Sequence, residues 1–494
     1  MTDESLAHRL QDFNPSFRDP AGTLVLHDSR IFRIISKLAM QDLTSFLTSK
    51  QGRKLLSSGN LVRTRFLSDS EKAEILQDLE VRRQARGFDV GGIAEHERVP
   101  FPSYPYEWPP EMLQAAGHLT LDLATGLLPE SLGVKDATPY NILFRGSSPV
   151  FVDLLSVERR EPRDPIWLAH AQFVRTFLLP LLVNKEFAVP LEQSLLSRRD
   201  GLEPEVVYHL CSALQKLRPP FLTLVSIPSW LGARHKAEDQ SIYRPHLVQN
   251  PEKARYILES LLNRLRRLLN RLTPANNRES HWADYMKSQR HYAPEELMAK
   301  QAFVEKALKE CKPTNVLDIG CNTGYFSALA ARQGASVVAI DSDPVVVGQV
   351  WRMATREKLD ILALVINLAR PSPSVGWRNG ECRSFLDRAS GHFDAVFMLA
   401  LIHHLLVSER IPLAEIMEVA AMLTSKLLVI EYVGPEDAMF RCLTRGRDSL
   451  FQGLNRQVFE AALVTRFECL ESRRLGQSHR WIYLLRKRAS NDTA

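Results

Sequence analysis

The sequence has few cysteines, and none of them is arranged as a metal-binding or disulfide-forming motif. The chain of 494 residues contains six cysteines, at Cys211, Cys311, Cys321, Cys382, Cys442 and Cys469. No two of them form a CxxC pair, which argues against a structural zinc site and against a disulfide framework. We therefore expect a protein of a reducing compartment in which most cysteines are small core residues and no metal is bound.

Long apolar runs are also absent. The most apolar stretch, Phe177–Val183, is short and contains a proline, whereas a membrane-spanning helix needs about 20 apolar residues. The N-terminus, beginning Met1-Thr-Asp-Glu-Ser, lacks the basic start and the apolar core of a signal peptide. These observations predict a cytoplasmic protein without a transmembrane segment.

The chain has little net charge for its length. It has 63 Lys and Arg against 57 Asp and Glu, a net charge of +6, so a nucleic-acid partner is not expected. Hydrophobic residues make up 45% and charged residues 24% of the sequence, which is typical of a folded protein. At about 100–200 residues per domain, the length predicts two to four domains.

A leucine-rich helix is the best candidate for a boundary between domains. Between Pro251 and Pro274, leucines recur at helical spacing and arginines lie mostly on the other face. The pattern predicts either a packing or connecting helix or, alternatively, a helix on a membrane surface. The polar stretch after Pro274 is typical of a linker. We predict a first domain over residues 1–250, a helical linker over 251–281 and a second domain over 282–494.

The second domain alternates short apolar strands with helices. Predicted strands are Asn315–Ile319, Ser336–Ile340, Ile361–Ile366, Phe393–Leu399 and Lys426–Tyr432, and predicted helices are Tyr325–Gln333 and Pro344–Glu357. This order predicts an α/β fold with a doubly wound parallel sheet that is covered on both faces. Two further strands, Phe467–Arg473 and Arg480–Arg486, predict a closing antiparallel hairpin.

The first strand of this sheet ends in a loop suited to a nucleoside ligand. The loop is Asp318-Ile-Gly-Cys-Asn-Thr-Gly324, followed by a helix from about Tyr325. Gly320 and Gly324 permit a tight turn and a close approach of the ligand, and Asp341, at the end of the next strand, suits the two hydroxyls of a ribose. A dinucleotide site remains an alternative, but it would need G-x-G-x-x-G, and Asn322 occupies the place of the second glycine.

These residues resemble the class I S-adenosylmethionine-dependent methyltransferases, whose first motif is D/E-x-G-x-x-x-G and whose sheet ends in an antiparallel hairpin. The chain is also similar to bacterial two-part, nodulation-type methyltransferase homologues. The shared segments are Asp318–Gly324, Leu399–Leu405, Ile430–Val433 and Trp282–Tyr285.

The resemblance implies a Rossmann-like domain over roughly Trp282–Lys487 that binds S-adenosyl-L-methionine. The residues that it implies for cofactor binding are Asp318, Gly320, Asn322, Gly324, Tyr325, Asp341 and, near the adenine, Asn367. For Asn367, an ordinary turn residue before Pro371 is the alternative.

Three residues are candidates for a role in methyl transfer. An oxygen or nitrogen acceptor must lose a proton, and histidine is the side chain best suited to take one near neutral pH. His403 and His404 follow the fourth strand and Glu431 ends the fifth. No Asn/Asp-Pro-Pro-Tyr/Phe motif occurs there, which argues against methylation of a base amine or a glutamine amide. A small molecule, a glycan or a lipid-linked acceptor is therefore favoured; the oligomeric state is not predicted.

The first domain has a second pattern, Asp136-x-x-x-x-Asn141 followed by a turn and a strand leading to Asp153. It resembles the catalytic core of protein-kinase-like folds, in which the first Asp orients a hydroxyl and the other two residues hold magnesium. The resemblance implies an α+β kinase-like fold. Val134-Lys135 stands in place of His-Arg, however, and no phosphate loop or strand lysine is found. An Asx-rich turn is the alternative.

Three functions follow from the two halves. The leading hypothesis is a methyltransferase with a degenerate kinase-like domain that positions the acceptor. The alternatives are a bifunctional kinase and methyltransferase, and a scaffold protein that binds S-adenosylmethionine without catalysis.

Overall fold

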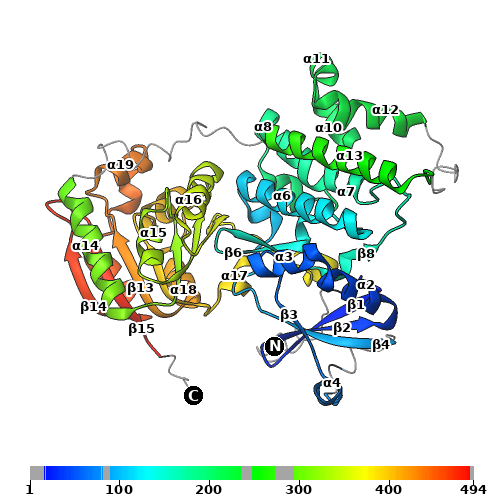
Figure 1. Cartoon of the computed structure of the whole chain (residues 1–494). Helices are drawn as coiled ribbons and strands as arrows, with labels where there is room; N and C mark the ends of the chain where they lie inside the picture. The colour runs from blue at the N-terminus through cyan, green and yellow to red at the C-terminus, as the bar shows by residue number, and fades with distance from the viewer. Residues whose placement is uncertain are drawn as a thin grey trace. The chain divides into compact units, whose positions relative to one another are not determined.

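The computed structural model describes residues 16, 18–78, 81, 89–234, 247–272 and 294–489 (Figure 1). The chain divides into two compact units. The first unit comprises Met1–Ala275 and Ser374–Cys382, and the second comprises Asn276–Pro373 and Arg383–Ala494. The predicted motif Trp282–Tyr285 lies outside the described residues.

The first unit begins with a small antiparallel sheet. Its strands are β1 (Gly22–His27), β2 (Arg30–Ser36), β3 (Thr64–Phe66) and β4 (Val90–His96), in the order β1-β2-β4-β3. Side chains alternate across such a sheet, and Phe32, Ile34 and Ile93 are buried in its core. Between β2 and β4 lie the helices α2 (Lys37–Thr48), α3 (Lys50–Ser58) and α4 (Asp69–Ile75).

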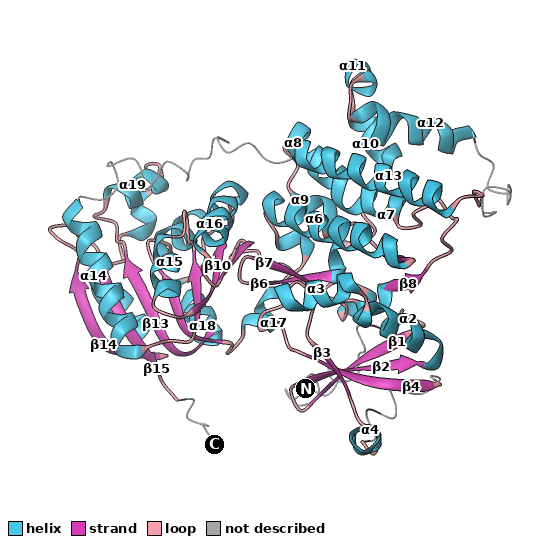
Figure 2. Cartoon of the chain, viewed as in Figure 1, coloured by secondary structure: helices cyan, strands magenta, loops and turns pink. Residues whose placement is uncertain are grey.

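The rest of the first unit is mainly helical (Figure 2). Its longer helices are α6 (Pro110–Leu127), α8 (Leu179–Phe187), α12 (Ile227–Arg234) and α13 (Pro251–Arg271), and its shorter ones are α7 (His170–Phe173), α9 (Leu191–Leu195), α10 (Pro204–Leu210) and α11 (Ala213–Leu217). Two antiparallel pairs of short strands lie between these helices in the sequence: β5 (Leu132–Val134) with β8 (Val157–Arg159), and β6 (Ile142–Arg145) with β7 (Ser148–Phe151). Within the described residues, no helix is both long enough and apolar enough to cross a bilayer.

Helix α13 is the leucine-rich helix expected from the sequence, and it belongs to the first unit. Leu258, Leu262, Leu265 and Leu269 are buried. The Gln114 side chain of α6 donates a hydrogen bond of 3.1 Å to the Leu269 carbonyl oxygen. The helix therefore packs through its apolar face, and the part of the predicted linker that follows it lies outside the described residues.

The second unit contains a seven-stranded sheet in the order β11-β10-β9-β12-β13-β15-β14. The parallel strands are β9 (Asn315–Ile319), β10 (Ser336–Asp341), β11 (Ile361–Val365), β12 (Phe393–Met398) and β13 (Thr424–Tyr432), and the hairpin strands are β14 (Phe467–Arg474) and β15 (Trp481–Lys487). The predicted parallel sheet and its closing antiparallel hairpin are thereby confirmed.

Helices surround this sheet, and those on one face build most of its core. On that face lie α14 (Pro294–Cys311), α15 (Tyr325–Arg332) and α16 (Pro344–Glu357), whose apolar side chains pack with those of the strands (Figure 2). The remaining helices are α17 (Phe385–Ala389), α18 (Leu413–Leu423), α19 (Ala438–Thr444) and α20 (Arg456–Leu463). Strand order reverses between β9 and β12, and ligands bind beyond the carboxyl ends of strands at such a point.

Residues Ser374–Cys382 belong to the first unit although they lie between β11 and β12 in the sequence. Glu381 links this segment to other parts of the first unit, because its carboxylate pairs with both Arg18 and Arg199. Its side chain is only 2% exposed. Gly376 has φ +92°, and a Cβ there would lie 2.2 Å from the Glu381 carboxylate. The tight packing around Glu381 thus requires a glycine at this position.

Candidate functional site

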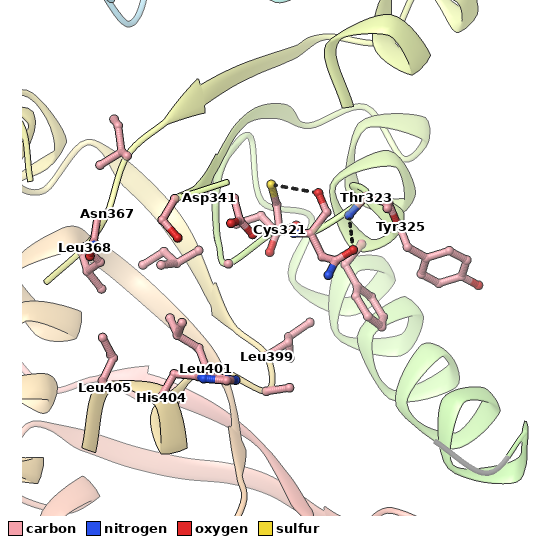
Figure 3. Close-up of a pocket in the computed structure, with 18 of the residues that line it drawn as sticks. Cys321, Thr323, Tyr325, Asp341, Asn367, Leu368, Leu399, Leu401, His404 and Leu405 are labelled. Carbon is pink, nitrogen blue, oxygen red and sulfur yellow. Dashed lines mark hydrogen bonds between the residues drawn. The ribbon is translucent and has the colours of Figure 1, made fainter. Parts of the chain in front are cut away.

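A cavity of about 320 Å³ lies at the carboxyl ends of β9, β10, β11 and β12 (Figure 3). This volume is at the lower end of the range for small-molecule sites, about 300–1,000 Å³. Six of the seven residues predicted to bind the cofactor line this cavity: Asp318, Gly320, Asn322, Tyr325, Asp341 and Asn367. The sheet therefore brings together residues from three separate strand ends.

The loop after β9 has the backbone conformation that its glycines permit. Gly320 and Gly324 have φ values of +71° and +80°, where a side chain would be strained. A Cβ at Gly324 would also lie 2.9 Å from the Val350 side chain of α16. Gly324, the seventh predicted residue, thus allows α15 to start close against α16. Asn322 also has a positive φ, +49°, a conformation that non-glycine residues adopt more often at functional sites.

Asp318 is buried at the end of β9 and faces α15. The Ser327 hydroxyl donates to its carboxylate at 2.5 Å. Burial raises the pKa of Asp318 to about 6, although the Ser327 hydroxyl and the Lys300 ammonium oppose this rise. A buried carboxylate at the cavity wall is well suited to bind a cationic group of a ligand.

Asp341 connects the ends of β9 and β10. Its Oδ2 accepts from the Asn322 backbone N–H and its Oδ1 from that of Asp343, each at 3.0 Å. Burial raises the pKa of Asp341, although these two hydrogen bonds oppose the rise. An ionised carboxylate has about four lone-pair sites, so Asp341 can hold the loop and still accept from ligand hydroxyls.

Asn367 and Tyr325 lie at other parts of the cavity wall. The Asn367 side-chain oxygen accepts a hydrogen bond of 2.8 Å from the Ala369 backbone. Asn367 is thus both a turn residue and a cavity residue. Tyr325 is 37% exposed, and its hydroxyl bonds to Gln301 at 2.5 Å. Figure 3 shows its ring directed away from the centre of the site.

Of the two neighbouring histidines, His404 lines the cavity and His403 is fully buried. Their ring centroids lie 4.2 Å apart. Burial lowers the pKa of both imidazoles, so both are neutral at pH 7. Among the residues that the structure describes, neither His403 ring nitrogen has a hydrogen-bond partner.

The backbone around His404 is irregular. His404 begins a turn of π-helix over His404–Ser408, and Ala400 has φ +52°. Both irregularities are more frequent at functional sites than elsewhere. This irregular loop positions His404 at the cavity wall.

Glu431, the third catalytic candidate, is fully buried at the end of β13. Its Oε2 lies 2.6 Å from Nζ of Lys300, a cavity-lining residue of α14. Lys300 was not among the residues predicted from the sequence. The sequence signal that could have identified it is its position, because Lys300 lies on the same helix face as the apolar residues Phe303, Val304 and Ala307.

In the first unit, the three residues of the kinase-like pattern lie close together. The Asn141 side chain donates to the Asp136 carbonyl oxygen at 3.1 Å, and the charge of Asp153 contributes, after burial, to a raised pKa of Asp136. Arg33 of β2 lies 3.1 Å from Asp153 and 3.4 Å from Asp19. The predicted metal-holding carboxylate is thus paired with a buried arginine that the sequence analysis missed.

Comparisons with known proteins find similarity to methyltransferases in part of this chain. Residues 258–475 match the family model described as a methyltransferase domain. The nodulation protein NoeA of Rhizobium meliloti (strain 1021) is 28% identical over 470 residues, which cover 95% of this chain and 94% of NoeA.

Solved structures resemble part of the chain. The N-methyltransferase NodS from Bradyrhizobium japonicum WM9 matches 39% of this chain and 96% of its own, with 16% identity and a TM-score of 0.29. The bifunctional kinase-methyltransferase WbdD matches 42% of this chain and 42% of its own, with 16% identity and a TM-score of 0.28.

Proposed function

Residues 258–475 match a methyltransferase-domain model, and from this premise we propose that the chain methylates an oxygen or nitrogen atom of a small molecule, a glycan or a lipid-linked acceptor. The methyl donor is S-adenosylmethionine, as the resemblance predicted. The observation that carries the proposal is the cavity at the four strand ends, which contains six of the seven residues predicted for this cofactor.

The residues present fit this cofactor. Asp318 provides a buried carboxylate for the ammonium group of the methionine part, and Asp341 provides acceptor oxygens for the ribose hydroxyls. The Asn367 side-chain oxygen accepts from the adenine amine, since one carbonyl oxygen has two lone pairs. The positive φ of Gly320 allows the ligand to approach the loop closely.

His404 is the base in this proposal. The sulfonium supplies an activated methyl group, which forms a bond with the acceptor atom as the carbon–sulfur bond breaks and its electron pair remains on sulfur. The lowered pKa of His404 keeps the imidazole neutral, so it can take the proton of the acceptor. His403 does not line the cavity and supports the loop by packing.

The test is transfer of isotope-labelled methyl groups. The purified chain is incubated with methyl-labelled S-adenosylmethionine and an extract of cells that lack this protein, and the extract is analysed by mass spectrometry. We expect a labelled product whose unlabelled form is one methylene heavier than its precursor. If the chain binds S-adenosylmethionine tightly and labels nothing in any extract, the scaffold function is the correct one.

We propose that the first unit is a degenerate kinase-like domain that positions the acceptor without transferring phosphate. The specific observation is the pairing of Asp153 with Arg33. A cation in this position competes with magnesium for the carboxylate. A bifunctional enzyme would need this ion pair to open, and binding of magnesium and ATP tests this alternative.

A further inference from the structure

Lys300 is a charged residue on the apolar face of α14. Its side chain is 4% exposed, and it aligns with the buried residues Phe303, Val304 and Ala307 of the same helix. Buried lysines are rare unless they are paired. The residue also lines the cavity, so this buried charge lies where a ligand can reach it.

A chain of ion pairs fixes the position of the Lys300 ammonium. Glu431 Oε2 lies 2.6 Å from Lys300 Nζ, and Glu431 Oε1 lies 3.7 Å from Arg480 Nη1. Arg480 in turn makes two hydrogen bonds with Asp437, at 2.7 and 3.1 Å. Removing one member would leave an uncompensated buried charge, so each member holds its neighbour in place. A lysine ammonium has three donors and can bind Glu431 and a ligand together.

Lys300 and Asp318 both line the cavity, and both lie against the first turn of α15, where the Ser327 hydroxyl donates to the Asp318 carboxylate at 2.5 Å. The charge of Lys300 opposes the rise in the pKa of Asp318, and Lys300 Nζ lies 5.1 Å from the ring centroid of Phe326, in the first turn of α15. This end of the cavity therefore presents a fixed cation beside a carboxylate. Its chemical complement is a zwitterion that carries both an anionic and a cationic group.

We infer that Lys300 binds the carboxylate of the methionine part of S-adenosylmethionine, while Asp318 binds its ammonium group. Glu431 and Arg480 are then positioning residues, which act through Lys300 and do not touch the acceptor. The inference rests on the proposed function for the identity of the ligand. It adds a determinant of specificity that the motif Asp318–Gly324 does not contain.

The test is a comparison of two ligands by isothermal titration. One is S-adenosylhomocysteine, and the other is its decarboxylated analogue, which has the ammonium group but no carboxylate. Substitution of Lys300→Met should weaken binding of S-adenosylhomocysteine by about 10-fold or more. It should change binding of the decarboxylated analogue by less than about twofold, because this ligand has no partner for the lysine.

Two further variants keep the result decisive. Lys300→Met together with Glu431→Gln removes both charges of the pair, so a ligand-selective loss in the double variant cannot come from a buried unpaired glutamate. Lys306→Met is the matched control, since Lys306 lies on the same helix, is exposed and pairs with Glu471; it should leave both affinities unchanged.

The inference is overturned if the Lys300 variants weaken both ligands equally, or neither. Failure of the proposed function is a separate result. Tight binding of S-adenosylhomocysteine with the expected loss in Lys300→Met, but without methylation of any acceptor, would contradict the proposed reaction and leave the role of Lys300 standing.

Discussion

The two units differ in how far apart in the sequence their clustered polar residues lie. In the second unit, the cavity residues lie at the carboxyl ends of consecutive strands, as Asp318 and Asp341 do. In the first unit, the polar cluster joins Asp19 and Arg33 to Asp153, more than 100 residues further along the chain. The strand-end residues of the cavity can therefore be predicted from local motifs. The pairing of Arg33 with Asp153 cannot, and neither can that of Lys300 with Glu431 in the second unit.

The difference follows from the kind of sheet in each unit. A parallel sheet places the carboxyl ends of all its strands at one edge. The strand positions in the sequence are therefore enough to predict that residues at these ends lie close together. In the small antiparallel sheet, consecutive strands run in opposite directions, and Arg33 lies within β2. Its partner on another element cannot be deduced from strand order.

The largest expected effect concerns His404 and tests whether the second unit is catalytic. Substitution of His404→Gln should lower the rate of methyl transfer by about 10²–10⁴-fold, the usual contribution of a general base. Because burial lowers the pKa of His404, the rate of the unaltered protein should be constant near pH 7. It should fall below an apparent pKa that lies under the ordinary histidine value of about 6.5.

The measurement is the initial rate of label transfer between pH 5 and pH 8. His479→Gln, in the exposed turn of the closing hairpin, is the matched control and should retain the full rate. If His404→Gln retains the rate and the pH profile, then His404 is not the base, and the chemistry needs only alignment of donor and acceptor.

Most of the second unit could be predicted because its strands and helices have clear hydrophobic patterns in the sequence. Buried parallel strands are continuous apolar runs, and the predicted strand Asn315–Ile319 and helix Pro344–Glu357 have the observed bounds. Lys300 was missed because a lysine on an amphipathic helix is ordinarily solvated. Its partner Glu431 is 131 residues away in the sequence, and only the folded sheet brings the two together.

The first unit was predicted only in pieces. The turn and hairpin around Asp136 and Asn141 were expected, since they are local, and β6 and β7 form that hairpin. The place of residues 374–382 in this unit was not expected. Glu381 of this segment pairs with Arg18 and Arg199, and the sequence gives no local sign of such distant contacts.

The second prediction concerns the affinity for the cofactor at the strand ends. Asp341→Asn should weaken binding of S-adenosylhomocysteine by about 10–100-fold, since charge-assisted hydrogen bonds contribute about 1.5–3 kcal/mol each. The measurement is isothermal titration. Asp343→Asn is the control, because Asp343 caps α16 and asparagine is an equally good cap. Equal affinities of the Asp341 variant and the unaltered protein would contradict the predicted ribose site.

The third prediction moves to the first unit and to stability. Glu381→Gln should lower the free energy of unfolding by about 2 kcal/mol, between the values for exposed and buried ion pairs, because Glu381 is buried but its two arginines are partly exposed. Urea unfolding measures the change. Glu357→Gln also loses contacts with two arginines, Arg332 and Arg356, at the surface, and should cost less than about 1 kcal/mol. Equal losses of unfolding free energy in the two variants would mean that burial of Glu381 does not strengthen its ion pairs.

The fourth prediction compares one buried histidine from each unit. Burial lowers the pKa of His96 to about 3 and that of His403 well below its usual value. The unfolded chain gains a proton below about pH 6.5 and the folded chain does not, so stability is full above that pH and is lost as the pH falls. At pH 5.5, each histidine should therefore lower the free energy of unfolding by about 1.4 kcal/mol.

Urea unfolding at pH 7.5 and pH 5.5 measures this loss. His96→Gln and His403→Leu should each remove about half of the combined acid sensitivity of the pair. His403→Leu should in addition be stabilising at pH 7.5, because it removes two buried ring nitrogens that have no partner among the described residues. An unchanged pH dependence in both variants would show that other groups set the acid limit.

The smallest expected effect is the response of the first unit to magnesium and ATP, and it decides whether the contrast between the units holds. A ligand present at ten times its Kd stabilises a protein by about 1.4 kcal/mol. Because Arg33 occupies Asp153, millimolar ATP with magnesium should cause no measurable rise in Tm, whereas S-adenosylhomocysteine in the same assay should cause a clear one. A rise with ATP that Asp153→Asn abolishes would contradict the degenerate domain. It would mean that the first unit, like the second, has a ligand site at its predicted motif, and that the ion pair with Arg33 opens when the nucleotide binds.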